Sequence, residues 1–188
     1  MAIGLSLGLL FGLTAALARG FTEKLILRLA DVGLAFPELL LALLVIAAIG
    51  PGATSAMVAI GLATVPNYTR LIRAQAVTVV QADYITAARA LGLPRARILL
   101  AHILPNALRP VIVLATIGLG TCTLAGAGLN FLGLGVSPPE AEWGSMLSTA
   151  RGFLSRAWWF GAFPGLAIIT LVISATVFGR SLRRILGG

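Results

Sequence analysis

Five long apolar segments constrain the fold of this chain more than any other feature of its sequence. They cover about residues 2–17, 32–50, 53–65, 111–134 and 159–178, and they contain almost no ionisable side chains. Of the 188 residues 59% are hydrophobic and only 11% are charged, against about 25% in an average soluble domain. Because so little polar material is available for a water-facing surface, we expect lipid to surround the protein.

The apolar segments predict an all-α integral membrane protein with about five transmembrane helices. A bilayer core of about 30 Å needs about 20 helical residues. The sequence Gly50-Pro51-Gly52 predicts a tight turn, which would make the second and third segments a pair of antiparallel helices. The third segment is short, and we expect its helix to continue through Tyr68 and Ile72. The 22 glycines favour close packing between helices in a membrane.

The basic residues predict the orientation of the chain. Three regions, residues 18–31, 66–110 and 179–188, hold 12 of the 14 Lys and Arg residues. With five crossings, all three regions lie on one side of the membrane, and basic loops lie preferentially in the cytoplasm. We therefore expect a cytoplasmic C-terminus, an external residue 1 and an external loop over residues 135–158.

The basic stretch from Asp83 to residue 110 predicts a helix–turn–helix. Asp83 suits the N-cap of a helix that begins at Tyr84, and Gly92 suits a left-handed position after its end. Pro94 suits the first turn of a second helix, which we expect to end near Pro105. The first helix is rich in alanine, and small exposed side chains allow another protein surface to approach closely.

This stretch resembles the EAA loop of the permeases of binding-protein-dependent ABC importers. That family carries Glu-Ala-Ala, three residues and Gly, followed downstream by Leu-Pro. Thr86 stands here in place of the glutamate. AARALG and HILPN are similar to the version in the peptide-transport subfamily. The positions that match the family motif are Ala87, Ala88, Gly92, Leu104 and Pro105.

The resemblance covers nearly the whole chain. Residues 31–44 (DVGLAFPELLLALL), 130–147 (NFLGLGVSPPEAEWGSML) and 163–186 resemble blocks of the dipeptide, oligopeptide and nickel permeases. Gly179 is followed by Arg180, where the family usually has aspartate. Family members commonly have a further span before this region, so the chain is expected to lack the usual first transmembrane span.

The resemblance implies a permease subunit of an ATP-driven importer, multi-pass in the bacterial inner membrane and specific for di- or oligopeptides. Its partners would be a second permease subunit, identical or different, two cytoplasmic ABC ATPases and a periplasmic or surface substrate-binding protein. The coupling loop would cover residues 68–110. The residues assigned to ATPase coupling are Asp83, Tyr84, Thr86, Ala87, Ala88, Arg89, Gly92, Leu104 and Pro105.

The sequence favours a chain without catalytic, cofactor or metal residues of its own. His102 is the only histidine, which excludes a histidine cluster. The sequence has no G-x-x-x-x-G-K-[ST] phosphate loop, so ATP would be bound by the partner ATPase. The glycine-rich residues 118–128 are apolar and favour helix packing. The net charge of +8 is spread over three regions, which favours lipid headgroups over nucleic acid.

Several alternatives stay open from sequence alone. A secondary transporter or channel usually needs polar residues along its pathway, and these are nearly absent. A permease fragment without activity is another alternative, and the substrate could be a dipeptide, an oligopeptide, nickel or another small solute. Asp31 and Glu38 are expected at the membrane interface. Residues 143–154 are expected to form an amphipathic element. Trp143, Trp158 and Trp159 are expected in an aromatic belt at the membrane interface.

Overall fold

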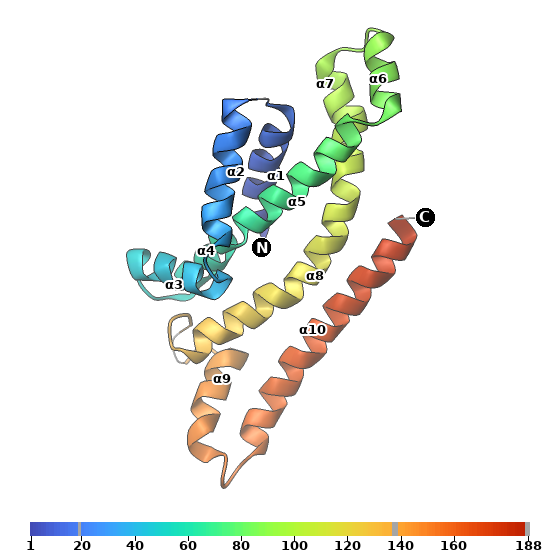
Figure 1. The fold of residues 1–188 in the computed structure, drawn as a ribbon. Helices are drawn as coiled ribbons and strands as arrows, with labels where there is room; N and C mark the ends of the chain where they lie inside the picture. Colours follow the sequence, from blue (N-terminus) through green and yellow to red (C-terminus); the bar gives the residue numbers. More distant parts are fainter. Residues whose placement is uncertain (19, 137–138, 187–188) are drawn as a thin grey trace.

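A computed structural model describes residues 1–18, 20–136 and 139–186 of the chain. Every regular element among these residues is helical, so the predicted all-α class is confirmed. Figure 1 shows an elongated molecule in which α6 and α7 lie at one end and α9 at the other. The elements are α1 (Ala2–Leu17), α2 (Phe21–Leu34), α3 (Glu38–Ile49), α4 (Ala53–Ala63), α5 (Val65–Val80), α6 (Asp83–Ala90), α7 (Arg95–Arg97), the π-helix η1 (Ile98–Ile103), α8 (Leu104–Phe131), α9 (Trp143–Ala150), the 3-10 turn η2 (Arg151–Phe153) and α10 (Trp159–Leu186).

Helix α1 packs closely on α5 because glycines recur at every fourth position along its buried face. Gly4, Gly8 and Gly12 are all buried. A Cβ atom on Gly8 would overlap the side chain of Tyr68, and one on Gly12 would lie 2.8 Å from the Cβ of Ile72. Small residues at this spacing let two helix backbones approach in a membrane, where van der Waals packing drives helix association. The bounds of α1 coincide with the first predicted segment.

The second apolar segment is divided between two helices, which corrects the expectation of one helix over residues 32–50. Helices α2 and α3 meet at an angle of 95°. The break falls at Pro37, which lacks an N–H donor and restricts the residue before it to extended conformations. Helix α2 begins well before the predicted segment, so Lys24 and Arg28 lie on a helix and not in a loop.

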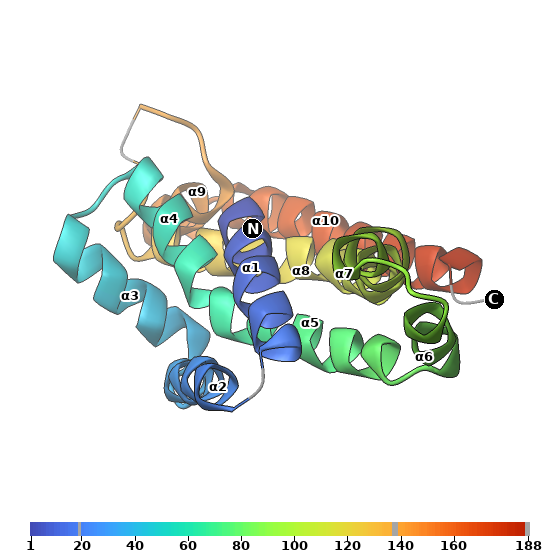
Figure 2. The same cartoon turned by 90° about the horizontal axis from the view of Figure 1, so that it is seen from above.

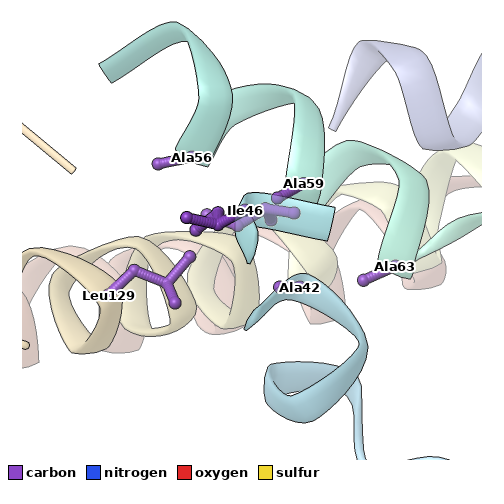
Figure 3. Close-up of a cluster of buried hydrophobic side chains, with 7 residues drawn as sticks. Ala42, Ile46, Ala56, Ala59, Ala63 and Leu129 are labelled. Atoms are coloured by element: carbon purple, nitrogen blue, oxygen red, sulfur yellow. The ribbon is translucent and has the colours of Figure 1, made fainter. Parts of the chain in front are cut away.

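The turn between α3 and α4 brings both helices against the end of α8. Gly50 and Gly52 have φ angles of +89° and +141°, which glycine adopts without strain. The N–H of Gly52 donates to the carbonyl of Leu134, 3.2 Å away, just beyond α8. Figure 3 shows the buried cluster that results. It contains Ala42 and Ile46 of α3, Ala56, Ala59, Ile60 and Ala63 of α4, and Leu129 of α8.

Two helical runs among the described residues are long and apolar enough to cross a membrane. They are Arg95–Phe131, with 37 residues, and Trp159–Ile185, with 27, and α2 with α3 makes a third if the bent pair is one crossing. The two long helices lie side by side in both views (Figures 1 and 2). Helix α1 is a shorter apolar helix. Helical structure does extend through Tyr68, as expected, but it is divided at Thr64 into α4, which ends at Ala63, and α5, which begins at Val65.

Candidate functional site

The predicted helix–turn–helix is present at the end of the molecule that carries α6 and α7 (Figures 1 and 2). Helix α6 ends at Ala90, and the chain turns through Gly92 before helical structure resumes at Arg95. Gly92 has a φ angle of +77°, which confirms the predicted left-handed position. Among the described residues, nothing lies within 4 Å of a Cβ built on Gly92. Backbone conformation, and not lack of space, therefore requires glycine here.

Two details of the predicted hairpin are wrong. Ala82 is the N-cap of α6, and Asp83 is its first helical residue. A negative charge at this position stabilises the helix, because the N-terminus is the positive end of the helix dipole. The second helix does not end near Pro105 but runs on into α8. The N–H of Leu104 bonds to the carbonyl of Leu99, five residues back, and this wide π turn leaves Pro105 in the first turn of α8. Pro105 has no N–H to donate, and the π turn just before it already interrupts the regular i to i−4 hydrogen bonding of the helical run.

The hairpin has a small hydrophobic core of its own. Ile85 and Ala88 of α6 are buried against Ile98 and Ile103 of the π-helix, with exposed fractions of 0% and 8%. The side chain of Asn106 bridges α6 and the helix that follows it. Its Nδ2 donates to the Tyr84 hydroxyl at 3.3 Å and to the His102 carbonyl at 2.8 Å. These contacts hold α6 in a defined position relative to the start of α8.

The outward face of α6 is built from small side chains. Asp83, Thr86, Ala87 and Ala90 are exposed at spacing i, i+3, i+4 and i+7, which places them on one face of the helix. Leu91 follows on the same side and is 80% exposed. Of the predicted alanines, Ala87 and Ala90 thus face outward, whereas Ala88 packs inside the hairpin.

Three of the remaining predicted coupling residues, Arg89, Leu104 and Pro105, lie away from this face. Arg89 is exposed and lines a cleft of about 830 Å³ between the hairpin and Leu17 at the end of α1. Leu104 is half-buried and Pro105 is exposed, both at the start of α8. Ile85, Leu91 and Asn106 also belong to the hairpin but are not among the residues predicted from the sequence. The spacing of Ile85 and Ala88 was the signal for an inward face of α6.

Two ion pairs tie α2 to α5, the helix that leads into the hairpin. Arg73 Nη2 lies 2.5 Å from Glu23 Oε1, and Arg70 Nη2 lies 2.5 Å from Asp31 Oδ1. The first pair is mostly buried and the second is half-exposed. Glu38 is the first residue of α3, as expected for a carboxylate near a helix N-terminus. Among the described residues, no three His, Cys, Asp or Glu side chains gather in a way that could hold a metal ion.

The opposite end of α8 carries the loop predicted to be external. Asn130 holds it to the helix: its Nδ2 donates to the Gly126 carbonyl at 3.0 Å, and its Oδ1 accepts from the Val136 N–H at 2.6 Å. Oε2 of Glu142 accepts from the N–H groups of Gly144 at 2.6 Å and Ser145 at 3.0 Å, which caps α9. Residues 137 and 138 of this loop, and the predicted basic residue at position 19, lie outside the described residues.

The chain is similar to known proteins over nearly its whole length. Residues 8–187 match the family model described as "Binding-protein-dependent transport system inner membrane component". The chain is 42% identical over 181 residues to the di/tripeptide transport system permease protein DppC of Pseudomonas aeruginosa, covering 96% of this chain and 60% of that protein. It is 38% identical over 186 residues to the probable D,D-dipeptide transport system permease protein DdpC of Escherichia coli, covering 99% and 62%.

A solved structure shows the same fold. The crystal structure of an amino acid ABC transporter with histidines matches with a TM-score of 0.64 and 19% sequence identity, covering 99% of this chain and 85% of that chain. The chain spans about 60% of the length of the curated relatives that it matches.

Proposed function

Because this chain belongs to the family of binding-protein-dependent transport system inner membrane components, we propose that it is a permease subunit of an ATP-driven peptide importer. The family is one of membrane transport permeases and not of enzymes. The observation that carries the proposal is the α6 hairpin, which presents a face of small side chains at the end of the molecule. Such a face lets a cleft of a partner protein close around the helix.

The hairpin is built to pass a displacement into the membrane helices. Its core residues Ile85 and Ala88 pack on the π-helix, which continues without a break into α8. The run from Arg95 to Phe131 extends about 55 Å along its path, at about 1.5 Å per residue. A force on α6 can therefore move the far end of α8, where Asn130 and α9 lie. We propose that this connection couples ATP hydrolysis in the partner to opening of the pathway.

The proposal places α6 and the C-terminus in the cytoplasm and the α9 end outside. Arg89, Arg95 and Arg97 are exposed on the hairpin, which fits the excess of basic residues in cytoplasmic loops. At the opposite end Trp158 and Trp159 are exposed, which fits an interfacial aromatic belt. Two cytoplasmic ATPases would bind ATP, a second permease subunit would complete the pathway, and a substrate-binding protein would dock near α9.

Peptides are the substrate class that the relatives favour. A di/tripeptide permease and a D,D-dipeptide permease are each about 40% identical to this chain. We propose import of short peptides on this basis.

The proposal is tested by co-expressing the chain with the ATPase and second permease encoded beside it, followed by an ATPase assay in lipid nanodiscs. We expect a stable complex whose ATP hydrolysis rises when binding protein and peptide are added. Peptide uptake into vesicles that is driven by an ion gradient and needs no ATPase would instead establish a secondary transporter. If the complex assembles only after an N-terminal span like that of the family is added, the longer protein and not this chain alone forms the transport pathway.

A further inference from the structure

A cleft of about 350 Å³ lies between α4, α8 and the loop that leads into α9. Its lining positions on α4 and on α8 follow the spacing i, i+3, i+4 and i+7, so each helix contributes one face. Met57 and Ile60 lie on the α4 wall, and Leu119 and Gly126 on the α8 wall. The volume falls within the range of about 300–1,000 Å³ that is typical of small-molecule sites.

The polar side chains that line this cleft present mainly hydrogen-bond acceptors. The Thr123 hydroxyl donates its proton to the Leu119 carbonyl at 2.9 Å, which leaves its lone pairs for a ligand. Asn130 Oδ1 accepts one bond, from Val136, and has a second lone pair. Glu142 is the carboxylate among the lining residues, and its Oε2 accepts both hydrogen bonds that cap α9. Within the described chain, Oε1 is left for a ligand.

A ligand that fits this arrangement carries a positive charge and several N–H donors at one end. A protonated amino group has one charge and three donors, and a carboxylate binds it through a charge-assisted hydrogen bond. From residue 119 to residue 130 the α8 wall is about 16 Å long, at about 1.5 Å per residue. An extended dipeptide spans about 7 Å and a tripeptide about 10 Å, so either fits along it.

We propose that this cleft binds the protonated amino end of a short peptide, with Glu142 as its counter-ion. The proposal rests on the proposed peptide transport and adds to it a site within the permease itself. The rest of the lining is apolar or small, except for the Cys122 thiol and for Met1 at the start of α1, and the flexible Met57 adapts to side chains of different shape. The cleft therefore recognises the amino terminus, which all unmodified peptides share, and tolerates variation elsewhere.

The test measures peptide binding to the assembled importer in lipid nanodiscs, without binding protein, by isothermal titration calorimetry. The probes are L-alanyl-L-alanine and its N-acetyl derivative. We expect the free dipeptide to bind the wild type about 10-fold or more tightly than the acetylated one, the order expected for one charge-assisted hydrogen bond. Glu142→Gln keeps an oxygen that can cap α9 but removes the charge, and it should weaken binding of the free dipeptide by a similar factor.

Glu140→Gln is the matched control, because Glu140 is exposed in the same loop and does not line the cleft. Gly126→Leu is a second variant that should abolish binding by filling the cleft, since a Cβ there makes only ordinary contact with Ile60, at 3.6 Å. Unchanged affinity in Glu142→Gln and Gly126→Leu, equal affinity for both probes, or no binding to the wild type would overturn the site. ATP-dependent uptake of radiolabelled dialanine is measured in parallel, and its absence would overturn the proposed function instead.

Discussion

Gly144 of α9 lies so close to Ala127 of α8 that a Cβ atom on it would overlap the Ala127 carbonyl oxygen. This approach explains why α9 carries glycine directly after Trp143. Glu142 caps α9 at the same point, so one short segment sets both the start of α9 and its distance from α8. The start of α9 is therefore held directly against α8.

Gly144→Ala should push α9 away from α8 and destabilise the protein by about 1–3 kcal/mol, as overpacking of a close contact does. Gly152→Ala is the matched control, because among the described residues nothing lies within 4 Å of a Cβ built there. The measurement is the midpoint of thermal unfolding in detergent. Equal midpoints for the two variants would show that the close contact with Ala127 is not maintained.

Gly8→Ala should loosen α1 from α5 by a similar amount, because its Cβ would overlap the side chain of Tyr68. Gly128→Ala provides the comparison within a helix, since no described atom lies within 4 Å of its added Cβ. Limited proteolysis of the protein in nanodiscs measures release of α1. If the two variants are cut at the same rate, glycine at position 8 is not needed for packing.

Ala87→Glu should abolish stimulated ATP hydrolysis while the protein stays folded, because Ala87 is exposed on the face proposed to bind the ATPase. Ala88→Glu should instead unfold the hairpin, since Ala88 is buried and a buried unpaired charge is costly. Ala87→Ser keeps the face small and should retain activity. Full activity in Ala87→Glu would exclude this face from coupling.

Glu23→Gln should destabilise the protein more than Asp31→Asn does. The Glu23–Arg73 pair is mostly buried, and loss of a hydrogen bond between charged groups costs about 1.5–3 kcal/mol in such a place. The Asp31–Arg70 pair is half-exposed, and pairs of that kind contribute about 0–1 kcal/mol. Chemical denaturation measures the free energy of unfolding of both variants. A larger loss of that free energy for Asp31→Asn than for Glu23→Gln would contradict the prediction.

The proposed orientation predicts which sites react with membrane-impermeant thiol reagents. In a Cys122→Ala background, a cysteine at Glu140 should be labelled from outside intact cells, and one at Arg95 only after the membrane is opened. Both positions are exposed in the structure, so burial does not confound the comparison. The reverse pattern would place the hairpin outside the cell and remove the basis for coupling to a cytoplasmic ATPase.

The sequence alone determined the features that depend on local chemistry. The bounds of α1, the continuation of helix through Tyr68, and the hairpin with Gly92 at its turn all follow from apolar runs and from glycine's access to positive φ angles. The family follows from motifs over most of the chain. For the helices and the hairpin turn, the information lies within a few adjacent residues, and packing elsewhere does not change it.

Only the tertiary structure decided features that depend on residues far apart in the sequence. Pro105 continues a helix because a π turn precedes it, and that turn packs Ile98 and Ile103 against Ile85. The glycines of α1 acquire a role only when α5 lies against them. The cleft that holds Glu142 exists because α4 returns against α8, which places residues 57, 126 and 142 around one space. Helix propensity acts along the chain, whereas packing selects among the conformations that propensity allows, and that selection requires the partner helix to be in place.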